Sequence, residues 1–228
     1  MFLNRANKII KKVYDICPIL EKSDKYNIKG DLLIPFYDES SHAITVGYQQ
    51  EFSTMLASSG DFTSINLGGF LAGALSKISR TLINNAKFNI VDFVVDRMAY
   101  AIARFIEGEL LNPSDPTNKV KGLSTVTLSV TAQSASAITA DELIKVQDKV
   151  KDIYQQDAIF IMSTATRTAL RLLKDNMGRY LLQDDISAPF GKTLLGKPVY
   201  VSDNMPEIAT KNTVIYYGDM SGLATKFG

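Results

Sequence analysis

Residues 89–113 read NIVDFVVDRMAYAIARFIEGELLNP and form the most apolar helix pattern of the chain. Asn89 is a favourable N-cap residue, and Asp92 complements the positive end of a helix. A helix over 90–111 would be roughly 33 Å long at 1.5 Å per residue. Its apolar residues lie nearly all round, which predicts packing on several sides. We expect it to bury Met98, Ile102 and Phe105.

The sequence after this helix predicts a compact α/β unit. Residues 123–138 are rich in Ser, Thr and Val and favour strand. Thr139 to Glu142 form a capping box, which predicts a helix to about Gln155. The core face of that helix is predicted to be Leu143, Val146, Val150 and Ile153. Ser163 should cap the next helix, with Gly178 at its end. Short strands are predicted at 158–162, 179–182, 198–202 and 213–217.

The sequence before the long helix predicts extended structure. Residues 3–15 fit a short amphipathic helix that Pro18 ends, and residues 19–30 are expected to be extended. Strand-like runs follow at Asp31–Tyr37 and Ala43–Phe52, with a turn expected between them at Asp38-Glu39-Ser40-Ser41, and a further run lies at Phe62–Leu67. Together they predict a long β-hairpin arm. Such an arm cannot bury itself against its own small domain, so its edges and apolar residues need a neighbour.

Composition restricts the function classes. The chain has 228 residues, 46% hydrophobic and 21% charged, which is enough for a core and for two domains. Cys17 is the single cysteine, so a disulfide framework is excluded and a reducing compartment such as bacterial cytoplasm fits best. No run approaches the roughly 20 apolar residues of a membrane span, and we expect no signal peptide.

Charge is distributed unevenly along the chain although its net value is only +1. Residues 1–30 contain seven Lys/Arg and three Asp/Glu, whereas residues 31–76 contain no Lys or Arg. One interpretation is ordinary solvated faces, and the other is an acidic arm that meets a basic partner surface. The acids of the second segment are Asp31, Asp38, Glu39, Glu51 and Asp61.

No motif of the chain completes a catalytic or ligand site. Gly191-Lys192-Thr193 resembles the end of a phosphate loop, but the glycine required upstream is replaced by Ile186. His42 is the only histidine and is expected to be solvated. Cys17 is expected to be a buried or idle thiol. The neighbours Asp184 and Asp185 lack further ligands for a metal. We therefore expect no enzyme, cofactor or metal.

Two stretches resemble the tailed-bacteriophage major capsid proteins of the Hong Kong 97 type. The first is Asn89–Leu123, in which Glu107-Gly108-Glu109-Leu110-Leu111-Asn112 ends the helix and a polar loop leads to Gly122-Leu123. The second is Leu172–Leu181, followed by Leu195-Gly196-Lys197-Pro198-Val199 and Gly218-Asp219-Met220. The similarity extends over essentially the whole chain and is weakest in residues 1–60.

The resemblance implies an α+β fold of the Hong Kong 97 capsid type with four parts. Residues 1–30 would be the N-arm and 31–70 the extended loop, or E-loop. Residues 71–122 would be the peripheral domain, with 90–111 as its spine helix, and 123–228 the axial domain. The family normally continues for several tens of residues and returns to the peripheral domain. That return is absent from this chain, so it would be a shortened form or an unusually short member.

Two further departures from the family bear on assembly. Some members cross-link covalently through an E-loop lysine, and residues 31–76 contain none, so this chemistry is not expected here. The sequence also has no long N-terminal scaffolding segment. Either that segment was removed, or a separate scaffold protein replaces it.

The function that the resemblance implies is formation of a phage or prophage shell. Copies of the chain would form hexamers and pentamers of an icosahedral virion capsid around double-stranded DNA, made in the host bacterial cytoplasm. Scaffold protein, portal and maturation protease would be partners, and a membrane would not. The alternatives are an encapsulin-type nanocompartment shell, a small α/β enzyme and a phage-derived binding module. Candidate interface residues are Glu51, Phe52, Met55, Leu56, Asp61, Lys11 and Lys12.

Overall fold

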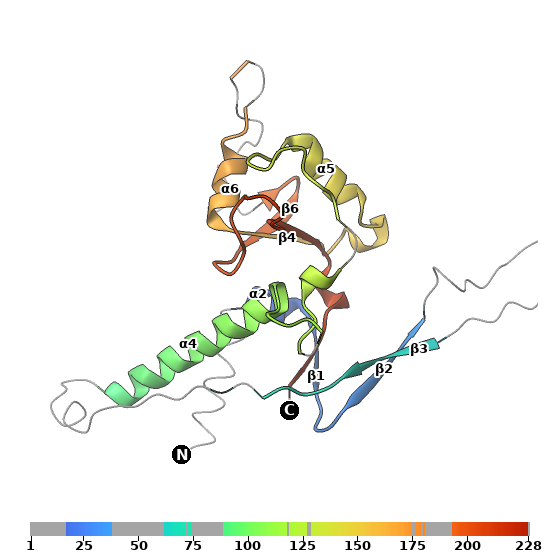
Figure 1. Cartoon of the computed structure of the whole chain (residues 1–228), viewed down its shortest axis with the longest axis vertical. Coiled ribbons are helices and arrows are strands. Elements are labelled where there is room, and N and C mark those ends of the chain that lie inside the picture. The colour runs from blue at the N-terminus through green and yellow to red at the C-terminus, as the bar shows by residue number, and fades with distance from the viewer. Residues whose placement is uncertain are drawn as a thin grey trace, which may run out of the picture. The chain divides into compact units, whose positions relative to one another are not determined.

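The computed structural model divides the chain into two units. It describes residues 17–37, 62–71, 73, 89–117, 119–126, 129–174, 177–178, 180 and 193–227. The first unit comprises Met1–Asp24 and Ala72–Leu223, and the second comprises Lys25–Leu71 and Ala224–Gly228. The described elements are labelled in Figure 1 where there is room. The predicted helix over 3–15 and the predicted strand Ala43–Phe52 lie outside the described residues.

Helix α4, Ile90–Leu111, has the bounds that the sequence predicts. The Asn89 side chain accepts a hydrogen bond from the backbone N–H of Asp92 at 3.3 Å, which confirms the predicted cap. The expected burial of Phe105 is wrong, because this side chain is 55% exposed, while Met98 and Ile102 are half-buried. The buried face follows Ala99, Ala103 and Leu110. At 100° per residue, Phe105 lies about 200° beyond Ala103, on the opposite face.

The core of the first unit is a four-stranded sheet in the order β5–β6–β4–β7. Its strands are β4 Ile159–Met162, β5 Thr193–Leu194, β6 Lys197–Val201 and β7 Ile215–Gly218. β4 runs parallel to β6 and antiparallel to β7, with Phe160 opposite Val199 and Tyr217. All four residues of β4 are buried, so this strand is the centre of the unit.

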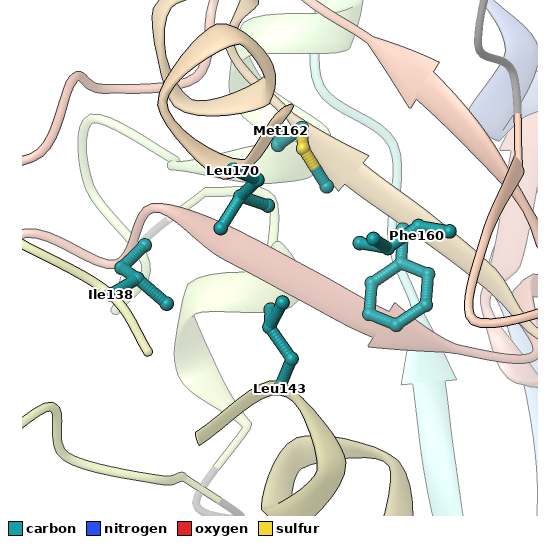
Figure 2. Close-up of a cluster of buried hydrophobic side chains, with 6 residues drawn as sticks. Ile138, Leu143, Phe160, Met162 and Leu170 are labelled. Atoms are coloured by element: carbon teal, nitrogen blue, oxygen red, sulfur yellow. The ribbon is translucent and has the colours of Figure 1, made fainter. Parts of the chain in front are cut away.

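Two helices supply the apolar side chains that cover this sheet. They are α5, Ala140–Asp148, and α6, Thr164–Arg171, and both lie beside the sheet in Figure 1. Figure 2 shows Leu143 of α5 and Leu170 of α6 converging with side chains of β4. The Phe160 and Tyr217 rings also pack together, with centroids 4.4 Å apart. The buried cluster consists of Ile138, Leu143, Phe160, Met162, Leu170 and Leu194.

The predicted caps of α5 and α6 are confirmed, but both helices end earlier than predicted. Thr139 and Glu142 form the capping box, and Ser163 caps α6 through the N–H of Thr166. α5 ends at Asp148, and beyond its end the Gln155 side chain folds back, so that its Nε2 donates to the carbonyl oxygens of Gln147 and Val150 at 2.7 and 2.9 Å. The helical period therefore does not reach Ile153, which is 79% exposed.

Other local expectations are corrected in the same unit. α6 ends at Arg171, so Gly178 is not its C-terminal cap, although its φ of +81° requires glycine. Among the described residues of 123–138 no strand is present. Residues 123–125 form the 3₁₀ helix η1, Leu123–Thr125, and those that follow find no partner strand. The remaining 3₁₀ helices are η2, Asp152–Tyr154, and η3, Met220–Gly222.

The segment around Pro18 also differs from its prediction. Pro18 begins helix α2, Pro18–Lys22, since proline is tolerated at the first helical position, and the helix that it was predicted to end lies outside the described residues. Residues 19–30 are consequently not all extended. Cys17, Ile19 and Leu20 are buried, so this short helix is part of the packed interior of its unit.

The second unit consists of two separate two-stranded ladders. One pairs β1, Asp24–Asn27, with β8, Ala224–Phe227, from the opposite end of the sequence. The other pairs β2, Leu32–Tyr37, with β3, Phe62–Leu67, in antiparallel register. The strands predicted at 31–37 and 62–67 are therefore present, and the structure pairs them with each other. The turn predicted at 38–41 lies outside the described residues.

Candidate functional site

The β2–β3 ladder exposes apolar side chains that no other described strand covers. Opposed residues share a face, so Leu32 and Leu67 lie on the same side as Ile34 and Ile65. Ile65 is nevertheless 50% exposed, and Leu33 on the other face is 62% exposed. Within the described residues the ladder has only two strands, so each strand also has an unpaired edge. This is a surface suited to contact with another chain.

The base of the ladder is held by the strand from the C-terminal side of the sequence. The ammonium group of Lys226 on β8 donates to the carbonyl oxygen of Gly30, which precedes β2. It also lies 3.3 Å from the carbonyl oxygen of Leu67, at the end of β3. Lys226 therefore ties both strands of the ladder to the β1–β8 pair.

A second exposed surface runs along the N-terminal two-thirds of α4. Phe93, Arg97, Tyr100 and Arg104 are spaced by three or four residues and are all exposed. Such spacing places side chains on one helical face. The Arg97 guanidinium lies 5.3 Å from the centroid of the Phe93 ring, a cation–π distance. Exposed Phe105 borders this face. Aromatic and arginine side chains are the types enriched in protein interfaces.

The C-terminal third of α4, by contrast, is tied firmly into its unit. The Asn204 amide Nδ2 donates to the Arg104 carbonyl oxygen at 3.0 Å and to Oε2 of Glu107 at 2.8 Å. The loop that returns from the helix passes so close that a Cβ on Gly122 would lie 2.6 Å from the carbonyl oxygen of Leu110. The helix is therefore anchored at its C-terminal end, while one face of its N-terminal two-thirds is exposed.

Burial changes the pKa values of two titratable side chains near the C-terminal end of α4. Burial raises the pKa of the Glu107 carboxyl, while hydrogen bonds from Ser202 and Asn204 partly oppose this effect. Burial likewise raises the pKa of the Cys17 thiol to about 11, so it remains protonated at neutral pH. Cys17 is fully buried, as the sequence led us to expect, and its thiol is not available for chemistry at the surface.

The described residues include no group of three His, Cys, Asp or Glu side chains that could hold a metal ion. No helix among them is long and apolar enough to cross a membrane. The described residues instead form two exposed surfaces that could contact another chain: the apolar β2–β3 ladder and the face of α4 that carries aromatic and arginine side chains.

The seven interface candidates chosen from the sequence all lie outside the described residues. They are Glu51, Phe52, Met55, Leu56, Asp61, Lys11 and Lys12. His42, Asp184, Asp185, Gly191 and Lys192 are outside as well.

The structure identifies other contact candidates, which sequence reasoning overlooked. They are Leu33, Ile65, Phe93, Tyr100 and Phe105. A signal for the helix face was present, because Arg97 and Arg104 mark the solvent side and share it with Phe93 and Tyr100. No comparable signal marked the Lys226 contacts, which join residues 196 and 159 positions apart.

Comparison with known proteins identifies the kind of protein that shares this fold. A model of the phage capsid family matches residues 6–226. No protein with a curated description matches the chain significantly. The solved structures that resemble it include the capsid of a native GTA particle, at 21% identity and a TM-score of 0.78. That match covers 89% of this chain and 73% of the other.

Chains from mycobacteriophages also share the fold. The structure from Mycobacterium phage Bobi has a TM-score of 0.68 at 13% identity, and the match covers 91% of this chain and 70% of the other. The structure from Mycobacterium phage Cain has a TM-score of 0.64 at 14% identity, with 90% and 68% covered. The predicted Hong Kong 97-type fold class is confirmed by these likenesses.

Proposed function

This chain belongs to the phage capsid family and is a structural capsid subunit, and from that premise we propose that its copies form the hexamers and pentamers of an icosahedral shell around double-stranded DNA. The function of the subunit is then to assemble through repeated contacts with copies of itself, and not to catalyse a reaction. Head-to-tail contacts between identical chains close into rings when the rotation between neighbours permits it.

The observation that carries this proposal is the uncovered β2–β3 ladder. An isolated two-stranded hairpin is marginally stable in water. This one exposes Leu33 and Ile65 and has no third strand among the described residues. Contact with a neighbouring subunit would remove this apolar surface from water and give the ladder packing that it lacks.

The ladder lies within the segment that we assign to the E-loop, residues 31–70. Residues 1–30 are assigned to the N-arm, 71–122 to the peripheral domain and 123–228 to the axial domain. We propose that the acidic arm, including Glu51 and Asp61, meets basic groups of a neighbouring copy, among them Lys11 and Lys12. The apolar candidates Phe52, Met55 and Leu56 would add contact area.

The stability of such a shell depends on the large number of contacts between its subunits. One exposed ion pair contributes about 0–1 kcal/mol, so no single charge contact holds two subunits together. A closed shell repeats every contact in every copy, and the sum becomes large. Scaffold protein, portal and maturation protease would act on this shell during its formation. The packaged DNA would be bound without sequence preference through its phosphates.

Assembly of the purified chain tests the proposal. Sedimentation velocity over increasing protein concentration should show conversion from small species to one large species, and electron microscopy should show closed shells. A single small species at every concentration would contradict self-assembly and favour a binding module. Shells recovered from cells with an enzyme inside, and without DNA, would instead indicate an encapsulin-type compartment.

A further inference from the structure

Glu107 is one of two glutamates buried among the described residues, and it sits where α4 meets the loop after β6. Its Oε2 accepts a hydrogen bond from Asn204 Nδ2 at 2.8 Å, and its carboxyl is also hydrogen-bonded by the Ser202 side chain. The backbone N–H of Asn204 donates to Ser202 Oγ at 3.1 Å, which fixes these two donors relative to each other.

The same loop holds the helix backbone directly. Asn204 Nδ2 also donates to the carbonyl oxygen of Arg104 at 3.0 Å, one turn before Glu107. Asn204 therefore joins the loop to α4 through two hydrogen bonds, one to the backbone of Arg104 and one to the side chain of Glu107. Whatever changes the state of Glu107 acts on this junction.

The titratable and charged groups that face Glu107 come from three elements. Arg104 lies on α4 itself, Asp203 belongs to the loop after β6, and Cys17 precedes α2. Asp203 is a like charge, and the Cys17 thiol is neutral at ordinary pH because burial raises its pKa to about 11. Arg104 is the only opposite charge among these groups, and it is exposed.

We propose that Glu107 and the Ser202–Asn204 loop form a proton-operated latch, which holds the C-terminal third of α4 more firmly when Glu107 is protonated. A protonated carboxyl still accepts the Asn204 hydrogen bond through its carbonyl oxygen, and its O–H becomes a donor toward Ser202 Oγ. Protonation also removes the cost of a buried charge and the repulsion from Asp203. This inference concerns the subunit alone and does not depend on shell formation.

The direction of the pH dependence follows from the balance of these effects. Burial is the largest influence on Glu107 and raises its pKa above the ordinary 4.5. A folded-state pKa above the unfolded one means that this stabilisation is fully present below the unfolded pKa. It is lost as the pH rises through the raised value. Mild acid should therefore tighten the junction, which is the reverse of the usual behaviour of a carboxylate.

Glu142 provides a matched control in the same unit. It is the other buried glutamate, but its pKa is lowered, chiefly by the backbone N–H groups of Gln133 and Thr139 at 2.7 and 2.8 Å. Its contribution to stability is therefore present above the unfolded pKa and is lost as the pH falls through the lowered value. The two side chains are chemically identical and should respond to acid in opposite directions.

The experiment compares the full chain with its Glu107→Gln and Glu142→Gln variants in thermal unfolding between about pH 7 and about pH 5. Glutamine is an isosteric mimic of the protonated acid. Glu107→Gln should therefore raise the unfolding midpoint near neutral pH and remove part of the gain that acid gives the wild type. A tenfold difference in proton affinity between folded and unfolded chain corresponds to about 3–5 °C in midpoint for a protein of this size. Glu142→Gln should lower the midpoint near neutral pH.

A direct titration needs no variant of the junction. Carbon-detected NMR of the glutamate side chains, with Glu107→Gln used for assignment, should give Glu107 a pKa above 4.5 and Glu142 a pKa below 4.5. Amide exchange at Asn204, corrected for intrinsic rates, should slow as Glu107 takes up its proton. A Glu107 that titrates at or below the ordinary value would overturn the proposal. So would a Glu107→Gln variant less stable than wild type near neutral pH.

Discussion

The phenolic oxygen of Tyr216 lies 2.8 Å from Oδ1 of Asn112, the C-cap residue of helix α4, which lies 104 positions earlier in the sequence. The same hydroxyl lies 3.3 Å from the carbonyl oxygen of Leu111. Edge strand β7 is thereby joined to the C-terminus of the long helix. Together with Asn204, Tyr216 makes the end of α4 a fixed point of the first unit.

Replacing Tyr216 with phenylalanine should destabilise the unit by about 0.5–1.5 kcal/mol, because the half-buried Asn112 amide and Leu111 carbonyl lose their donor. Denaturant unfolding followed by circular dichroism measures this difference. Tyr154→Phe is the control, since the Tyr154 side chain is exposed and should tolerate the change within about 0.5 kcal/mol. Equal effects of the two substitutions would mean that the Tyr216 contacts contribute nothing.

Gly122 should not tolerate a side chain. A Cβ there would lie 2.6 Å from the Leu110 carbonyl oxygen and from Pro113 Cδ. Gly122→Ala should cost about 1–3 kcal/mol through displacement of the loop from the helix. Gly222→Ala is the matched control, because a Cβ at that position meets nothing within 4 Å. Chemical denaturation of both variants decides the matter, and a Gly122→Ala protein as stable as wild type would contradict the close approach.

The two phenylalanines Phe160 and Phe105 should respond differently to truncation. Phe160 is fully buried beside Leu143 and Leu170, so Phe160→Ala should cost about 3–5 kcal/mol. Phe105 is 55% exposed, so Phe105→Ala should cost about 1 kcal/mol or less in the isolated subunit. If the α4 face contacts a neighbour, the second variant should instead lower assembly yield. A Phe105→Ala subunit that unfolds as readily as Phe160→Ala would show that the helix face is covered within the chain.

Polar substitution on the exposed ladder should separate assembly from folding. The Leu33→Ser, Ile65→Ser double variant should retain most of the stability of the subunit, because both side chains are at least half exposed. Its sedimentation profile should shift from shells toward small species, since apolar area available to a neighbour is lost. Ser64→Ala, a change at an exposed site on β3, is the control. Unchanged assembly of the double variant would remove the ladder from the interface.

Charge on the arm should affect assembly in a salt-dependent way. Glu51→Gln with Asp61→Asn should spare subunit stability and weaken assembly most at low salt, where exposed charges are least screened. Assembly yield against salt concentration, for this double variant and the wild type, measures the effect. Identical curves at low and high salt would mean that the charge asymmetry of residues 31–76 is incidental and that shape and apolar contact hold the arm.

Local order in this protein was determined by the sequence itself. The bounds of α4, the Asn89 cap, the Thr139–Glu142 capping box and the buried strand β4 were all predictable. Each depends on residues within one or two turns of one another, and the physics of capping and amphipathic period acts over that range. The fold class was predicted from the resemblance of the sequence to a known family, in addition to these local patterns.

Long-range relationships were decided only by the tertiary structure. Gln155 folds back onto the C-terminal end of α5, β8 pairs with β1, and Asn204 contacts Glu107 across 97 positions. The sequence also did not predict which face of α4 is exposed, because apolar residues lie nearly all round this helix and do not distinguish a buried face from an exposed one. Such contacts depend on how distant segments are brought together in space, and hydrophobic pattern and local propensity encode only what a segment does with its own neighbours.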